Sequence, residues 1–478
     1  MLFGTRRKVM DMNYLFDRCH STYRQNREVW ERSLAAYSGG REYISRALIK
    51  HVSEIDLEYA ERLERAYYFN YPRKIASLIT QYIFASDPDR EGADTLLCED
   101  VSRDGMRINE LMRQASTMVN VFGSAWLVVE MPGFNGFVDM ERKVREKIRP
   151  YMKCYTPLMV RDWAYGSDGA LEWILLEQPG FNNRDPFRPP FYRVQRKLVT
   201  RDRWMLLAAD GPGGRIKVVA EGENAGGCVP AVHLQEADNN ALGASHWFAD
   251  VVRISDAILN NESEAQMNVV KQLFGLLVIS ETFARQGKKC EMKSSDGGRK
   301  EKFSHIIARS AAIFESPEEK GISRYIAPTG VETERIREEN LKLKSELFDV
   351  VGLTLRPDAK LRQTAESKAW DYQNTRQFLA NRVDMLEQAE VLCWKFMKNF
   401  DPSVPVPKVA YNRDFSVVDM KDMIEGLSEL VKLSGSREYE KEISRTAVDM
   451  LGKYKKIDPK RKKKIIEEID GMKQGTFL

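Results

Sequence analysis

The sequence has few cysteines, and none of them stands in a paired motif. Its 478 residues include six cysteines that are scattered singly, with no CxxC pair and no closely spaced framework. Structural zinc sites and disulfide-rich secreted domains need such spacing, so both are disfavoured. We therefore expect a protein that folds in a reducing compartment.

Long apolar runs are missing as well. No stretch of roughly 18 apolar residues occurs, and the first residues, MLFGTRRKVMDMNYLF, have no apolar segment behind their basic residues. We therefore expect neither a membrane-spanning helix nor a secretory signal. With 43% hydrophobic and 30% charged residues, the composition is that of a folded protein, long enough for about two or three packed units.

Motifs that carry catalysis are also missing. No GxxxxGK[ST] phosphate loop, HExxH zinc motif or GxSxG nucleophile elbow occurs, and the five histidines lie far apart. Neighbouring acids such as Glu338 and Glu339 are conceivable Mg²⁺ ligands, but a solvated surface is the better interpretation in a chain with 70 acidic residues. The sequence therefore predicts a protein that is not an enzyme and has no cofactor or metal.

A strong excess of one charge is lacking too. The chain has 74 basic and 70 acidic residues, a formal net charge of +4. A protein that binds DNA over much of its surface is usually far more basic. Any contact with DNA is therefore expected to be local.

The first half of the sequence predicts helices followed by a sheet. Asn70 and Pro72 are suited to the start of a helix. Between 108 and 122, apolar residues recur at i, i+3, i+4 and i+7, which indicates an amphipathic helix. From about 132 to 232, short β-branched and aromatic runs indicate a mostly antiparallel β region. Its strands are expected at 151–160, 171–177, 191–199, 204–208 and 216–220.

The second half returns to helical patterns. We expect helices from 245 to about 270 and from 332 to Gly352, separated by a small insertion that begins with a strand at 276–279. Residues 366–399 contain no Pro or Gly and predict a helix of roughly 50 Å. A Pro-rich linker at 401–407 and two shorter amphipathic helices follow.

Two basic segments are candidates for contact with DNA. The first lies between two predicted helices, either as an ordinary loop or as a loop that points into a channel. The second could contact phosphates, or could be a helix start whose charges Glu467 and Glu468 balance. The first comprises Arg356, Lys360 and Arg362, and the second comprises Lys453, Lys455, Lys456, Lys460, Arg461, Lys462, Lys463 and Lys464.

The order of the predicted elements resembles the portal family of tailed bacteriophages, the head-to-tail connectors. Local stretches are similar to portal sequences as well, and the resemblance covers nearly the whole chain. These stretches are YFNYP at 68–72, YIF at 82–84, VFGSAWLV at 121–128, LNNESE at 259–264 and QTAESK at 363–368.

The resemblance implies an α+β, mainly helical portal fold with a wing, a stem, a clip and a crown. It also implies a long wing helix and an antiparallel β region. The wing would comprise residues 1–244, the stem helices 245–270 and 333–350, the clip 271–332, the tunnel loop 351–365, the long wing helix with its linker 366–407, and the crown 408–478.

The function implied by the resemblance is that of a homododecameric ring at one capsid vertex of a virion, assembled in the host cytoplasm. Double-stranded DNA would pass through the ring during packaging and ejection. The other implied partners are the terminase large subunit, a head-tail adaptor protein, the major capsid protein and a scaffolding protein, with no membrane. Arg356, Lys360 and Arg362 are then the first candidates for DNA contact, and the 453–464 segment is the second.

Two alternatives from other classes stay open at this point. A DNA-processing enzyme, such as a phage nuclease or terminase subunit, would need a carboxylate cluster or a phosphate loop. Another symmetric virion structural protein would differ from a portal in its ring stoichiometry.

Overall fold

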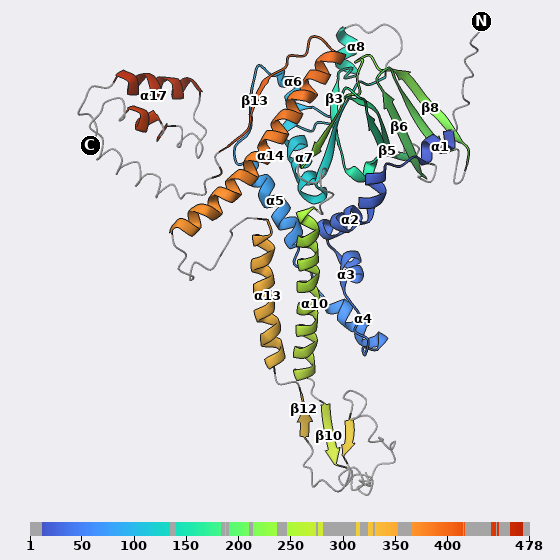
Figure 1. Ribbon diagram of the computed structural model, residues 1–478, viewed down its shortest axis with the longest axis vertical. Helices are drawn as coiled ribbons and strands as arrows, with labels where there is room; N and C mark the ends of the chain where they lie inside the picture. Colours follow the sequence, from blue (N-terminus) through green and yellow to red (C-terminus); the bar gives the residue numbers. More distant parts are fainter. Residues whose placement is uncertain are drawn as a thin grey trace.

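The computed structural model describes residues 12–133, 140–182, 187, 191–209, 214–236, 246–273, 276–280, 312–315, 324–327, 330–351, 365–413, 415, 441–445, 447–448 and 459–471. The fold is α+β and mainly helical, as expected. Helices and antiparallel sheets form a body, and a helical hairpin extends from it (Figure 1). Among the helices within these ranges, none combines the length and apolarity that a membrane span needs.

The N-terminal part of the chain is helical. Its helices are α1 (Met12–Asp17), α2 (Ser21–Ser38), α3 (Arg41–Ala47), α4 (Asp56–Arg65), α5 (Tyr71–Ile83) and α6 (Thr95–Glu99). The side chain of Asn70 accepts a hydrogen bond from the Arg73 N–H, and Pro72 lies in the first turn of α5, which confirms the predicted start. The sequence pattern did not indicate α2, although its Tyr23 and Trp30 are buried.

The core of the body lies between α7 (Ile108–Phe122) and a three-stranded antiparallel sheet. The predicted bounds of α7 are confirmed. The sheet has the order β3–β2–β9, and every residue of its central strand is buried. Alternate residues of that strand, such as Leu127 and Trp126, belong to the core against α7 and to the core against the second sheet. The strands are β2 (Ser124–Glu130), β3 (Tyr151–Tyr155) and β9 (Ala231–Gln235).

The second sheet is a five-stranded antiparallel meander, which confirms the predicted β region. Its strands are β4 (Val160–Tyr165), β5 (Leu171–Asn182), β6 (Phe191–Thr200), β7 (Arg203–Ala209) and β8 (Ile216–Glu223), in that order. The single strand expected at 151–160 is wrong. A 3-10 turn at Pro157–Met159 separates β3 from β4, and the two strands belong to different sheets. Pro157 has no N–H to donate to a continuous ladder.

The helical hairpin consists of α10 (Trp247–Leu273) and α13 (Val331–Asp349), which lie side by side (Figure 1). A small sheet of β10 (Leu276–Ser280), β11 (Ala312–Glu315) and β12 (Arg324–Ile326) follows at its far end. The central strand β10 pairs parallel with β11 and antiparallel with β12. The predicted order of helix, insertion with strands and helix is therefore confirmed.

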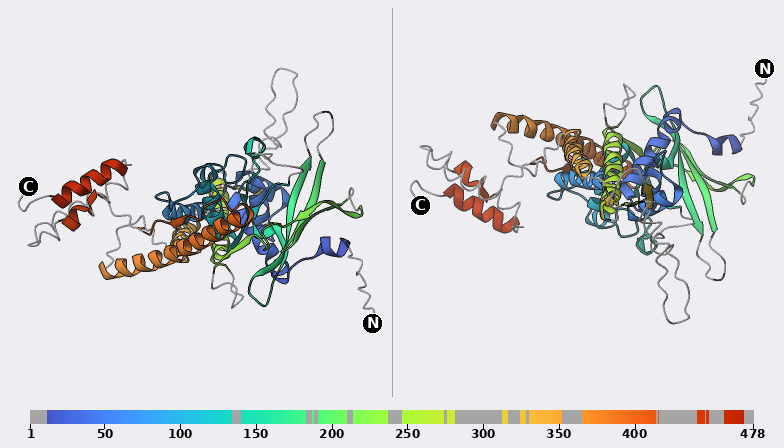
Figure 2. Two further views of the ribbon diagram at one scale, coloured as in Figure 1. Left: turned by 90° about the horizontal axis from the view of Figure 1, so that it is seen from above. Right: turned by 90° about the horizontal axis from the view of Figure 1, so that it is seen from below.

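The long helix α14 (Ala365–Phe400) runs across the body, as Figures 1 and 2 show. It contacts α5, α7, β2 and β9, and its buried stripe includes Leu379, Val383 and Leu386. The expected long helix is therefore confirmed. The remaining elements are β1 (Asp89–Glu91), α8 (Met140–Arg145), β13 (Lys408–Ala410), which pairs antiparallel with β1, and α17 (Pro459–Gly471).

Candidate functional site

Most of the residues predicted to contact DNA lie outside the described part of the chain. They are Arg356, Lys360, Arg362, Lys453, Lys455 and Lys456. The described elements fix the ends of the first segment, because α13 ends at Asp349 and α14 begins at Ala365. The first three residues therefore connect the hairpin to the long helix, in the order that the sequence predicts.

The other residues of the C-terminal basic segment lie on α17. This helix begins at Pro459, so residues 460–464 fill its first turns, where the helix dipole disfavours positive charge. The side chains of Arg461, Lys463 and Lys464 are exposed. The helix start expected from the sequence is present.

A buried polar cluster joins the two helices of the hairpin. Asn340 of α13 is 1% exposed. Its Oδ1 accepts a hydrogen bond from Asn261 Nδ2 at 2.9 Å, and its Nδ2 donates to Glu262 Oε1 at 2.9 Å. A lone buried asparagine in a helix pair penalises every register in which its amide lacks partners. Asn340 therefore fixes the position of α13 along α10.

Where the chain returns from the small sheet to the hairpin, its backbone conformation favours a glycine. Gly330, which precedes α13, has a φ of +88°, in the left-handed region that favours glycine. A Cβ atom at this position would lie 3.1 Å from Nε2 of Gln272 on α10. The chain can therefore return from the small sheet to α13 close against α10.

Asp256 connects the N-terminal half of α10 to the N-terminal helices of the chain. Its carboxylate accepts a hydrogen bond from Arg32 of α2, with Nη2 and Oδ2 2.5 Å apart, and another from the hydroxyl of Tyr43 of α3. Burial, together with the adjacent carboxylate, raises the pKa of Tyr43 above its usual value. The neighbouring Asn260 accepts a hydrogen bond from the Ile49 N–H at 2.8 Å. The base of the hairpin is thus a rigid joint.

A second buried network fixes α14 to the body. Glu390 of α14 is fully buried and forms an ion pair with Arg90 of β1, with Nε and Oε1 2.5 Å apart. The hydroxyl of Tyr411 donates to the same carboxylate at 2.6 Å, and Trp394 Nε1 donates to it at 3.3 Å. Burial and this carboxylate raise the pKa of Tyr411, so its hydroxyl keeps its proton. Arg90 Nη2 also donates to Oε2 at 3.0 Å, so four donors face the buried carboxylate.

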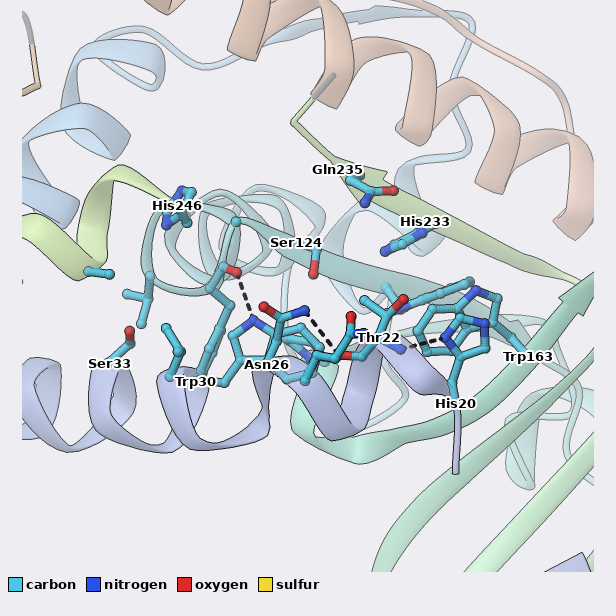
Figure 3. A pocket seen from close by; sticks show the side chains of 18 of the residues that line it. His20, Thr22, Asn26, Trp30, Ser33, Ser124, Trp163, His233, Gln235 and His246 are labelled. Carbon is cyan, nitrogen blue, oxygen red and sulfur yellow. Dashed lines mark hydrogen bonds between the residues drawn. The ribbon is translucent and has the colours of Figure 1, made fainter. Parts of the chain in front are cut away.

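A cavity of about 730 Å³ lies between α2, the sheet β3–β2–β9 and the five-stranded sheet (Figure 3). His20 stacks on Trp163 and His233 stacks on Trp126, each with ring centroids 3.9 Å apart. Burial lowers the pKa of His233 to about 3, so this ring is neutral at pH 7. The stacking on Trp126 shows that His233 is a packing residue.

The walls of this cavity are neutral. The described residues that line it include no Asp, Glu, Lys or Arg. Within the described part of the chain, no group of three His, Cys, Asp or Glu side chains is placed to hold a metal ion. The convergence of His20, His233 and His246 on one cavity has no signal in the sequence, because the three residues come from distant elements.

Comparisons with known proteins give only remote similarities. No protein-family model matches the chain, and no curated protein sequence matches it. Similar solved structures include a chain of the virion of a native gene transfer agent (GTA) particle, with a TM-score of 0.40, 10% identity and coverage of 86% of this chain and 98% of that chain.

Two further matches come from the necks of such particles. A chain from the neck of the empty particle, computed with C6 symmetry, has a TM-score of 0.39 and 10% identity, covering 75% of this chain and 84% of that chain. A chain from the neck of the native particle, computed with C12 symmetry, has a TM-score of 0.38 and 8% identity, covering 78% and 89%. At TM-scores of 0.40 or lower, neither fold nor function is inferred from these matches.

Proposed function

We propose that this chain is a phage portal protein, the subunit of a ring at one capsid vertex through which DNA is packaged and ejected. The observation that carries the proposal is the helical hairpin (Figure 1). It extends from the body, ends in a small sheet and returns to the long helix α14 that crosses the body. Copies of such a hairpin, arranged side by side around an axis, would line a channel with the small sheets at one rim.

The proposal gives each part of the chain a role. Residues 1–244, with the sheet β3–β2–β9 and the five-stranded sheet, would form the wing. Residues 366–407 would form the long wing helix and its linker. The stem would be α10 and α13, within 245–270 and 333–350, and the clip 271–332. The tunnel loop would be 351–365, and the crown 408–478. The joint at Asp256 and the cluster at Asn340 support this division, because they make the hairpin a rigid extension of the body.

Arg356, Lys360 and Arg362 are the proposed DNA contacts. They connect the body end of α13 to α14, and a ring would bring a dozen copies of this connection together. A net charge of only +4 per chain fits a channel in which DNA slides, since many phosphate contacts would bind the duplex too strongly. The basic residues of the 453–464 segment are proposed as a second, weaker contact.

The proposed partners follow from the same arrangement. The terminase large subunit would dock at the clip during packaging and supply the energy of ATP hydrolysis. A head-tail adaptor protein would bind after packaging, and the major capsid protein would surround the wing, with a scaffolding protein during assembly. The chain itself would guide DNA without catalysing a reaction.

Whole particles provide a test of the proposed location. An antibody raised against the purified chain should label particles that contain the protein at a single vertex, where head and tail meet. Labelling over the entire shell or along the tail would contradict a portal and favour another virion structural protein.

A further inference from the structure

An apolar patch spans the connection between α3 and α4 and the first turn of α4. Ile49, Val52, Ile55 and Leu57 have exposed fractions of 71%, 100%, 60% and 68%. Apolar side chains that are exposed next to one another can form an interaction surface. We name these four residues the α4 patch.

The opposite flank of the hairpin exposes apolar side chains as well. Leu341 and Val331 of α13 are 64% and 50% exposed. Arg337 lies one turn before Leu341, so the two side chains share a face of the helix. We name Arg337 and Leu341, together with Val331 at the start of the helix, the α13 face. Helix α10 lies between the two surfaces, since it contacts α3 and α4 as well as α13 (Figure 1).

The two surfaces lie at the same level along α10 near its middle. The side chain of Asn260 accepts a hydrogen bond from the Ile49 N–H, at the start of the α4 patch. The next residue, Asn261, donates to Asn340, which directly precedes Leu341. Consecutive helix residues differ in level by only about 1.5 Å. Ile49 and Leu341 therefore lie at matching heights on opposite sides of α10.

Both surfaces continue along the C-terminal half of α10, toward the small sheet. His51 and Ser53, which flank Val52, border the same small cleft as Lys271 of α10. Gly330, which directly precedes Val331, lies against Gln272. Val52 is therefore placed beside the C-terminal half of α10, and Val331 beside its last turn. Two surfaces that match in level at Ile49 and Leu341 can meet there without a shift along the helix axis.

Charged residues add complementarity to the two surfaces. Within the described part of the chain, Arg337 of α13 and Glu61 of α4 have no ion-pair partner in the same subunit. Glu334 and Glu338 also lie on α13, so one arginine does not give this flank a net positive charge. An Arg337–Glu61 pair would instead select one register of the contact, which is the usual effect of charges at the rim of an interface.

We propose that the α13 face of one subunit packs against the α4 patch of a second copy of this chain. The inference rests on the proposed ring function, and it identifies the two surfaces by which neighbouring subunits of the ring meet at the stem. Such a contact is heterologous, because two different surfaces meet, and it leaves both surfaces available for further copies. Rotation about an axis parallel to α10 carries no copy along that axis, so matched levels favour closure into a ring over an open helix.

Two single variants test the contact, since each blocks one surface. Leu341→Asp disables the α13 face, and Leu57→Asp disables the α4 patch. Each variant should fail to form rings, because a buried, unpaired carboxylate weakens the contact by roughly a hundredfold. Leu96→Asp is the matched control: Leu96 is 71% exposed on α6, away from both surfaces, and this variant should assemble like the wild type.

Mixing the two variants gives the decisive result. Each variant alone should be monomeric in mass photometry, whereas an equimolar mixture should give a heterodimer, because one intact α13 face then meets one intact α4 patch.

A reversal of charge tests the proposed ion pair. Arg337→Glu should weaken assembly, and the further substitution Glu61→Arg in the same chain should restore it.

The outcomes separate this contact from the portal function. Wild-type rings that persist in both aspartate variants overturn the contact and leave the portal proposal intact. A homodimer of Leu341→Asp alone also overturns it, because the α4 patch would then bind itself. A heterodimer from the mixture, combined with open filaments rather than rings from the wild type, supports the contact and contradicts the portal.

Discussion

Arg90 and Glu390, which lie 300 residues apart in the sequence, form a buried ion pair with Nε and Oε1 2.5 Å apart. Arg90 Nη2 donates to the second carboxylate oxygen at 3.0 Å. The pair connects β1 to α14 inside the main core. It therefore helps to hold the C-terminal half of the long helix on the body.

Replacement of one residue of this ion pair should lower the stability of the folded chain. Glu390→Gln leaves Arg90 buried without its counter-charge, so we expect the free energy of unfolding to fall by about 3–5 kcal/mol. Urea unfolding of the unassembled chain would measure it. Arg27→Ala, which removes an exposed ion pair with Glu31, should change stability by less than about 0.5 kcal/mol. Equal losses in the two variants would contradict the role of the buried pair.

Asn340 should determine the register of the hairpin. Asn340→Ala leaves the polar groups of Asn261 and Glu262 without their partner, so we expect a loss of about 1–3 kcal/mol. Hydrogen exchange should increase along α10 and α13 and stay unchanged in the five-stranded sheet. Lys342→Ala, at an exposed position of α13, is the control. Unchanged exchange in the Asn340 variant would refute the assignment.

Acid should destabilise the body through His233. Burial lowers the pKa of this group to about 3 in the folded chain, below the value of about 6.5 expected in the unfolded chain. The unfolded chain therefore binds the extra proton first, and stability falls as pH drops from 6.5 toward 3, by about 1.4 kcal/mol for each pH unit.

Replacement of this histidine tests the sign of that effect. His233→Phe keeps a ring against Trp126 and removes the titrating group, so its melting temperature should depend less on pH between 6.5 and 4. The same replacement at the exposed His51 should leave the wild-type profile unchanged. A steeper profile in His233→Phe than in the wild type would show that the assignment is wrong.

The basic connection between α13 and α14 should contribute to DNA affinity. Alanine at Arg356, Lys360 and Arg362 should lower the affinity of assembled rings for duplex DNA and reduce its dependence on salt, because fewer counterions are released. Fluorescence anisotropy at several salt concentrations would measure both effects.

A matched triple variant controls for the loss of positive charge. Alanine at Arg201, Arg203 and Lys217 removes three basic residues at the strands β7 and β8 and the turn before them, away from the proposed channel. This variant should keep the wild-type affinity and salt dependence. An equal loss of DNA affinity in both triple variants would indicate a general effect of charge and would contradict the assignment of residues 351–365 as a tunnel loop.

Much of the fold follows from local sequence patterns. The bounds of α7 follow from its apolar periodicity, and the start of α5 follows from Asn70 and Pro72. The hairpin with its insertion and the long α14 follow from helical patterns and from the absence of Pro and Gly. These features depend on interactions within a few turns of chain, which is why sequence alone predicts them.

Other features depend on contacts between distant segments. The pair of Arg90 and Glu390 has no local signature, and the burial of Tyr23 and Trp30 on α2 becomes clear only when the body is folded. The strand expected at 151–160 illustrates the same limit. Its apolar pattern is continuous, but the chain passes from one sheet to the other at Pro157.

The central claim is that the chain forms a ring, and electron microscopy of the purified protein, combined with the mass of its oligomer, tests it most directly. We predict closed rings of about a dozen subunits with an axial channel wide enough for a DNA duplex. A monomer or a dimer under all conditions would contradict the claim and return attention to a DNA-processing enzyme.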